Sequence, residues 1–192
     1  LFNKCAEAGY LGLRYPESLG GAGADALTFA LMLEGLAHGS LSLAVVVMMQ
    51  CLMGTNFVHR FGTPDHHERL LKPALRGEKI GTIAMTEPDA GSDLGSITTS
   101  AHPDKNGSGW VLNGRKMWIT SATVADFFTV AAKTDPEAGF KGIDLFLVEK
   151  GTPGLSVGRK IDKLGVRASE TSEVILEDVR VPAENLLGKQ GT

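Results

Sequence analysis

The stretch KIGTIAMTEPDAGSDL (Lys79–Leu94) joins an apolar run to a rigid polar turn, and it marks where the chain changes character. Thr86 ends a predicted strand, and Pro88 prevents that strand from continuing. Residues 90–93, Ala-Gly-Ser-Asp, permit a close backbone turn and supply a hydroxyl and exposed amides. Such a turn can hold something flat with a polar edge.

Upstream of this stretch the sequence pattern is helical. The segment Asp25–Gly39 has apolar residues at three- and four-residue steps, with Asp25 available as an N-cap, so we predict a mostly buried helix there. A second helix is expected to start near Ser40 or Ser42 and run toward Phe61. A third begins in TPDHHERLL, whose threonine can cap it.

The longest apolar run is LSLAVVVMMQCLM (Leu41–Met53), which Ser42 and Gln50 interrupt. It is shorter than the ~20 residues that a membrane span requires. We therefore expect a buried helix and no membrane span.

Downstream of Gly77 the signals are short β-rich runs: KIGTIAMTE, SITTSAH, GWVLNGRKMWIT, DFFTVAAKT, GIDLFLVEK and SEVILEDVRV. Asn113-Gly114, between WVL and RKMWIT, is typical of a type I′ hairpin turn. The expected fold class is α+β and multidomain. A partial helical domain (residues 1–79) precedes a β-barrel-like domain (residues 80–192).

Charge and cysteine content narrow the class of function. With 19 basic and 22 acidic residues and a net charge of -3, the chain lacks the basic excess that nucleic-acid binding needs, so we expect no nucleic-acid partner. Cys5 and Cys51 lie far apart without zinc-site spacing. This fits packing cysteines in a reducing compartment.

For three further features we favour a structural role over a functional one. SLGGAGAD (Ser18–Asp25) is glycine-rich but matches no phosphate-loop pattern, so we expect a plain loop. His66 and His67 are adjacent on a helix and point about 100° apart, which favours a solvated face over a shared metal ion. Glu34, on an apolar helix, is either a buried base or, more simply, a structural carboxylate with a polar partner.

The run KMWITS carries a second candidate site. The two-residue period of a strand places Trp118 and Thr120 on one face, which offers an apolar plane beside a hydroxyl. A tricyclic flavin needs such a pair. Taken alone, Trp118 is equally compatible with a core aromatic.

Together these motifs resemble the acyl-CoA dehydrogenase family across nearly the whole chain. The resemblance rests on AMTEPDAGSDLGS, NGRKMWITSA and FLVEKGTPGLSVGRKIDKLGVRASETSEVILEDVRVPAENLLG, and more weakly on YPESLGGAGAD and LKPALRGEKIGTIA. Members have an N-terminal helical domain, a middle β domain and a C-terminal helical bundle. The resemblance implies that part of the first domain and the second are present and that the C-terminal bundle is absent from these residues.

The resemblance implies FAD as the cofactor. The peptide at Met85 and Thr86 would line the pyrimidine edge of the flavin, Trp118 would border the rings, and the Thr120 hydroxyl would bond the hydride-accepting nitrogen. Ser92 would lie near the phosphates and the CoA moiety. The full implied cofactor set is Ile83, Ala84, Met85, Thr86, Gly91, Ser92, Trp118, Ile119 and Thr120.

The implied reaction converts an acyl-CoA to a trans-2-enoyl-CoA. A base takes the α-proton while the β-hydride passes to the flavin, and the electrons go on to an electron-transfer flavoprotein. The family base is usually a glutamate of the C-terminal domain, so we assign no catalytic residue here, not even Glu34, Glu87 or Glu173. Full-length members form homotetramers or homodimers.

The resemblance also implies substrate contacts. Ser92 would approach the CoA, and Val45, Val46 and Met49 would face the acyl chain, although these three are equally compatible with bundle core. Phe140 stands where several members carry a small polar residue near the CoA. GVRASETSEV is interpreted as a structural turn in which Arg167 pairs with an acid.

Alternative functions remain on the same scaffold. An acyl-CoA oxidase or a flavin monooxygenase would react with oxygen, and the isolated chain would also suit a non-catalytic flavin- or CoA-binding module. The intact TEPDAGSD and WIT motifs favour the dehydrogenase. Bacterial cytoplasm and mitochondrial matrix are both compatible with the sequence.

Overall fold

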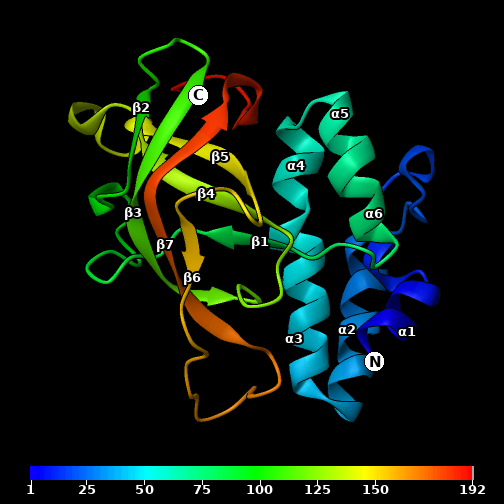
Figure 1. Ribbon diagram of the computed structural model, residues 1–192. Helices are drawn as coiled ribbons and strands as arrows, with labels where there is room; N and C mark the ends of the chain where they lie inside the picture. Colours follow the sequence, from blue (N-terminus) through cyan, green and yellow to red (C-terminus); the bar gives the residue numbers. More distant parts are fainter. Residues whose placement is uncertain (192) are drawn as a thin grey trace.

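The computed structural model describes residues 1–191. Figure 1 shows the helices on one side of the molecule and the strands on the other. In residues 1–191 the last α-helix ends at Leu75 and the first strand begins at Gly81, so the change from helix to strand lies where the sequence pattern changes.

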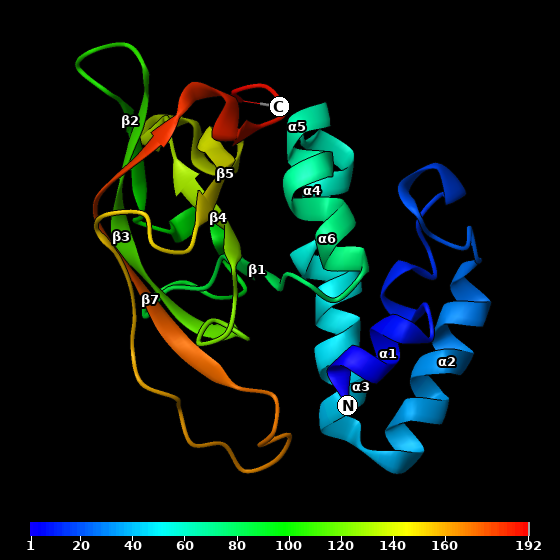
Figure 2. The same cartoon turned by 45° about the vertical axis from the view of Figure 1, so that its right-hand side comes forward.

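The helices form two layers beside the sheet. Figure 2 shows the rod that contains α3 and α4 standing between the sheet and α2, in agreement with the contacts of this rod with α2 and β1. The helical elements are α1 (Phe2–Glu7), η1 (Tyr10–Gly12), η2 (Glu17–Leu19), α2 (Ala26–Gly39), α3 (Leu41–Met49), η3 (Gln50–Gly54), α4 (Asn56–Phe61), α5 (Pro64–His66), η4 (His67–Leu71) and α6 (Lys72–Leu75).

Helix α2 is capped as predicted but is less buried than predicted. The Oδ1 atom of Asp25 accepts a hydrogen bond from the Thr28 amide at 2.8 Å. Phe29 is buried, whereas Leu27 and Leu31 are 66% and 58% exposed, because α2 is the outer helical layer. Glu34 is exposed too and has no partner among the described residues, so neither interpretation of it was right.

The rod from Leu41 to Phe61 is one continuous helix with a π-helical turn, η3, in its middle. With 21 residues and a mean hydropathy of 1.8, it is long and apolar enough to cross a membrane by length and composition alone. A core helix passes the same test. Here Val47, Cys51 and Val58 are buried inside the protein.

The π-helical turn fixes the start of the first strand. The Oε1 atom of Gln50 accepts a hydrogen bond from the Gly81 amide at 3.0 Å, and Gln50 Nε2 donates to the Lys79 carbonyl at 3.0 Å. A Cβ atom added at Gly54 would lie 2.6 Å from the carbonyl carbon of Gly81. Glycine at position 54 therefore lets the helix and the strand approach closely, which sets the position of the segment that follows.

In the described part of the chain, eight strands form one sheet in the order β6-β7-β3-β2-β4-β5-β8, and β1 pairs with β4 in parallel. β6 and β8 are short strands that the sequence patterns did not predict. The bounds of the strands are β1 (Gly81–Ala84), β2 (Ser100–Pro103), β3 (Gly109–Thr120), β4 (Phe127–Lys133), β5 (Ile143–Glu149), β6 (Leu155–Val157), β7 (Thr171–Pro182) and β8 (Leu186–Leu187). Three short helical turns lie in the connections: η5 (Leu94–Ser96), η6 (Pro136–Gly142) and η7 (Ala183–Asn185).

The sheet curves around its own core, in keeping with the barrel-like expectation. One cluster of buried side chains draws members from six strands, which requires the strands to face a common interior. The cluster includes Ala84 of β1, Leu112 of β3, Phe128 of β4, Phe146 of β5 and Val174 of β7.

The predicted hairpin at Asn113-Gly114 is wrong. Both residues lie inside the continuous strand β3, where the register with β7 shifts. The Asn113 side chain bonds Asp178 on β7 through its Nδ2 (3.0 Å) and its Oδ1 (2.8 Å). A Cβ atom at Gly114 would lie 2.7 Å from the Cα of Thr99, so the glycine serves a close approach and not a turn.

Candidate functional site

Two segments that lie about thirty residues apart in sequence meet in the fold: the end of β1 with its following turn, and the end of β3. The Met117 amide donates to the Thr86 carbonyl at 2.8 Å. The Thr82 hydroxyl donates to the Thr120 carbonyl at 2.6 Å. These bonds bring MTEPDAGSD beside KMWITS, as a shared site requires.

The polar turn is built around Glu87. Its amide donates to the Ala90 carbonyl at 2.8 Å, and the Ala90 amide donates back at 3.3 Å, which closes the turn over Pro88. The Glu87 carboxylate accepts from the amide and hydroxyl of Thr98 (2.6 and 2.8 Å) and from the amide of Thr99 (3.0 Å). The turn is therefore anchored to the segment that leads into β2.

A buried lysine completes this anchor. Lys116 Nζ donates to Glu87 Oε1 at 2.8 Å and to the Met85 carbonyl at 3.1 Å, and the Lys116 side chain is 0% exposed. Burial alone raises the pKa of Glu87, but the donors from Lys116, Thr99 and Thr98 outweigh it and lower that pKa to about 2. Burial lowers the pKa of Lys116, and the hydrogen bond to Glu87 opposes this. Nζ therefore has two acceptors, the Glu87 carboxylate and the Met85 carbonyl.

Trp118 is held in an unusual backbone conformation. The register between β3 and β7 shifts between Lys116 and Ile119, and Trp118 has a φ of 62° and is 56% exposed. A bulky residue at positive φ is strained, and such strain is concentrated at functional sites. Lys116 and Ile119 are both buried although they lie three residues apart, so the simple two-residue period fails at the bulge.

The two candidate side chains lie on either side of a buried residue. Trp118, inside the bulge, is exposed and Thr120, after it, is half-buried, and both flank the buried Ile119. No group in residues 1–191 bonds the Thr120 hydroxyl, nor accepts from the amides of Met85, Thr86, Gly91 and Ser92.

These groups fit a flat ring with polar edges and an attached phosphate chain. The indole offers an apolar face, while the hydroxyl and the free amides supply polar partners for ring edges and phosphate oxygens. Gly91 has no positive φ, and a Cβ atom there would meet no atom within 4 Å. The chain's own packing therefore does not require glycine at this position, but a close ligand would.

The other predicted cofactor residues contribute differently. Ile83, Ala84 and Ile119 are buried, so their side chains belong to the core. Gly91 and Ser92 are exposed on the turn.

An apolar hollow of about 270 Å³ lies next to the polar turn. Met85 is common to the hollow and to the segment MTEPDAGSD, and Phe140, 68% exposed, also lines the hollow. Sequence reasoning missed this hollow, because it forms between α4, the turn and β5. Its lining is Phe57, Phe61, Met85, Leu94, Ile97, Ala131, Phe140, Ile143 and Leu145.

The predicted acyl-chain residues lie elsewhere on the same helical rod. Val45, Val46 and Met49 are half-buried on α3 and are not part of that lining. All three carry uncharged side chains, so this stretch of helix offers an apolar surface.

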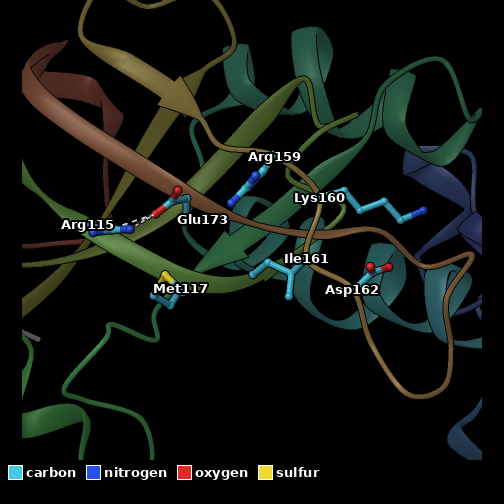
Figure 3. A pocket seen from close by; sticks show the side chains of 7 residues that line it. All are labelled: Arg115, Met117, Arg159, Lys160, Ile161, Asp162 and Glu173. Atoms are coloured by element: carbon cyan, nitrogen blue, oxygen red, sulfur yellow. Dashed lines mark hydrogen bonds and ion pairs between the residues drawn. The ribbon is translucent and has the colours of Figure 1, made fainter.

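A second, charged hollow of about 450 Å³ lies along β3 and β7. Figure 3 shows Arg115 and Glu173 directed at each other, whereas the Lys160 side chain extends away from them. Lys160 pairs with Glu170 at 3.3 Å, and Arg167 pairs with Asp162 at 3.1 Å, as expected for a structural turn. These charges are mostly exposed, and Glu173 is engaged by Arg115, so this hollow offers no free acid or base.

Two minor interpretations have definite outcomes. The glycine-rich loop is a plain loop: the amides of Gly21, Ala22 and Gly23 donate to carbonyls of the chain itself, so they are not free for a phosphate. The prediction that His66 lies on a solvated face is wrong. It is 1% exposed, because its Nδ1 accepts from the Thr63 amide and its Nε2 lies 3.4 Å from Asn185 Oδ1. The structure places no cluster of three or more metal-ligating side chains in residues 1–191.

Lys116 and the strain at Trp118 were missed by sequence reasoning. A lysine in the apolar run KMWI and a glutamate directly after an apolar strand were the available signal for a buried pair. The buried pair was not predicted because the predicted hairpin turn at Asn113-Gly114 ended a strand two residues before Lys116.

Comparison with known proteins gives consistent matches over both parts of the chain. Residues 1–78 match the family described as "Acyl-CoA dehydrogenase, N-terminal domain", and residues 82–179 match "Acyl-CoA dehydrogenase, middle domain". A benzylmalonyl-CoA dehydrogenase of Aromatoleum aromaticum is 53% identical over 99% of this chain and 49% of its own length.

Two solved structures are also similar. An acyl-CoA dehydrogenase complexed with FAD from Bacillus anthracis matches with a TM-score of 0.90 and 36% identity, over 99% of this chain and 32% of that one. The prolyl acyl carrier protein oxidase AnaB matches with a TM-score of 0.93 and 38% identity, over 99% and 50%. The chain spans about half the length of the curated relatives it matches.

Proposed function

This chain belongs to the acyl-CoA dehydrogenase family, and from that premise we propose that the protein catalyses FAD-dependent α,β-dehydrogenation of an acyl-CoA thioester and passes the electrons to an electron-transfer flavoprotein. The observation that carries the proposal is the exposed Trp118, strained at positive φ beside the unpaired Thr120 hydroxyl. A site with this shape and polarity suits a flavin.

The residues that would hold FAD are those with unused hydrogen-bonding groups. Trp118 would cover an apolar part of the rings, and the Thr120 hydroxyl and the amides of Met85 and Thr86 would bond polar atoms at the ring edge. The amides of Gly91 and Ser92 would face phosphate oxygens. When bound, FAD supplies the two-electron acceptor.

The substrate would occupy apolar surface near this site. The hollow beside Met85 suits an uncharged part of a thioester, and Val45, Val46 and Met49 suit a hydrocarbon chain. Ser92, exposed on the turn, is available to the polar CoA moiety.

The base that removes the α-proton would lie outside residues 1–192, as the family resemblance implies. Glu87 is unsuited, because a pKa of about 2 and four donors make its carboxylate a poor proton acceptor. Glu173 is paired with Arg115, and Glu34 lies on the outer helix α2. This chain's part in the reaction is then to bind and orient.

An oxygen-reacting oxidase is the second candidate. The similarity to AnaB, at 38% identity and a TM-score of 0.93, is as high as that to the Bacillus anthracis dehydrogenase. Fold similarity therefore does not separate dehydrogenase from oxidase.

The test uses the full-length protein loaded with FAD. Straight, branched and aromatic acyl-CoA thioesters are assayed with ferrocenium and with electron-transfer flavoprotein as acceptors, and hydrogen peroxide is measured in air. We expect turnover with both acceptors and little peroxide. Rapid peroxide formation would establish the oxidase, and no thioester oxidation with any acceptor would refute the proposal.

The same panel tests the acyl-chain face. Met49→Ala is expected to shift kcat/KM toward longer chains, because a flexible side chain that fills the pocket is shortened. Met48→Ala is the matched control, since residue 48 is half-buried on the same helix and points about 100° away. Equal chain-length profiles for the two variants would show that Met49 packs in the helix core and does not contact the acyl chain.

A further inference from the structure

The Met85–Thr86 peptide is tied to β3 from one side only. Its carbonyl, that of Met85, accepts from Lys116 Nζ at 3.1 Å, and the next carbonyl, that of Thr86, accepts from the Met117 amide at 2.8 Å. Both bonds therefore pull carbonyl groups toward β3.

The amide of the same peptide must point the opposite way. Residues 1–191 contain no cis peptide bond, and in a trans peptide the C=O and N–H bonds are antiparallel. The Thr86 N–H consequently faces away from the buried ammonium. It has no acceptor in the part of the chain that the structure describes, and Thr86 is half-buried, so a ligand is the natural acceptor.

The ammonium group also changes the strength of this donor. A positive charge on a carbonyl oxygen draws electron density from the peptide and makes its N–H a better donor, as hydrogen bonds in a chain polarise one another. The effect is large where water is excluded, and the Lys116 side chain is 0% exposed. Glu87 keeps the ammonium group in place from the other side.

Resting on the proposed flavin site, we propose that Lys116 is a positioning residue. Its ammonium group fixes and polarises the Met85–Thr86 peptide so that the Thr86 N–H is presented to the polar edge of the bound ring. Lys116 acts through the peptide and does not touch the ring. This role is separate from neutralising Glu87, which the same side chain also performs.

The two roles are separated by a double variant of the full-length protein. Lys116→Met with Glu87→Gln removes both charges, so no uncompensated charge is left in the core, but the Met85 carbonyl loses its partner. Arg115→Met is the matched control, because it removes a cation from the adjacent position on β3, where Arg115 is exposed and bonds Glu173 instead. Thermal unfolding confirms that each variant is folded.

The readouts are FAD affinity of the apoprotein, the visible absorption spectrum and the flavin reduction potential. If Lys116 positions the peptide, the folded double variant binds FAD at least about tenfold more weakly, with a displaced spectrum and potential, while Arg115→Met matches the wild type. A double variant with wild-type affinity, spectrum and potential would show that Lys116 only neutralises Glu87, and would overturn the inference alone. A wild-type protein that binds no FAD would overturn the proposed function, and the inference with it.

Discussion

Replacing Glu87 by glutamine should destabilise the protein strongly at neutral pH. The change leaves the ammonium group of Lys116 buried without a counter-charge and turns an amide NH₂ toward groups that donate to the carboxylate. Removing one partner of a buried ion pair costs about 3–5 kcal/mol. The pKa gives a similar figure: a value of about 2 against the ordinary 4.5 corresponds to about 3 kcal/mol at ~1.4 kcal/mol per pKa unit.

The pH dependence has a definite sign. The folded pKa of Glu87 is lower than the unfolded one, so the ionised carboxylate stabilises the fold fully above pH 4.5, and this stability is lost as the pH falls toward 2. By pH 3 the wild type should have lost about 2 kcal/mol from this group, a loss that Glu87→Gln does not share. The difference between the two proteins should therefore shrink in acid.

Urea unfolding of the wild type and Glu87→Gln at pH 7 and at pH 3 measures both effects. Glu173→Gln is the control, because it disrupts an ion pair in which Arg115 is 58% exposed and should cost less than about 1 kcal/mol. The reasoning is refuted if Glu87→Gln costs no more than Glu173→Gln at pH 7, or if its cost is the same at both pH values.

Three further predictions concern the proposed cofactor site and one structural glycine in the full-length protein. Thr120→Val should slow flavin reduction about threefold to tenfold with unchanged stability, since one neutral hydrogen bond is worth roughly 0.5–1.5 kcal/mol; an unchanged rate in stopped flow would contradict the assigned role. Gly91→Ala should leave the unfolding free energy within about 0.5 kcal/mol of wild type but weaken FAD binding, because a Cβ there meets only open space that the cofactor would take. Gly114→Ala should do the opposite and cost about 1–3 kcal/mol, because its Cβ would lie 2.7 Å from the Cα of Thr99. Equal stability of these two glycine variants would refute the distinction.

Local sequence signals predicted elements well where the cause is local. Asp25 caps α2 and Ser40 caps α3 because an N-cap hydroxyl or carboxylate bonds an amide only three residues away. Most strands were also predicted from their residues, because the alternation of apolar and polar residues and the turn residues that bound a strand act over only a few positions. The polar turn and the Trp118–Thr120 segment were selected from residue types, and their proposed roles toward a cofactor came from a resemblance, which also rests on the sequence.

Other features depended on neighbours that the sequence does not show. Asn113-Gly114 has the composition of a hairpin turn, yet the close approach of Thr99 and the bonds to Asp178 hold it inside a strand. The exposure of Leu27 and Leu31 follows from the outer position of α2, because an apolar periodicity specifies a face but not what covers it.

The sequence by itself determined that a helical part precedes a strand-rich part, and it determined the polar turn after β1 and the family. Each of these depends on residue types at short, fixed spacing. Only the tertiary structure decided that Lys116 reaches Glu87 and the Met85 carbonyl, and that Trp118 adopts positive φ at a bulge. The physical reason is that a buried charge takes its partner from whichever segment folds against it, here 29 residues away, and a bulge arises from the pairing of two strands and not from either strand alone.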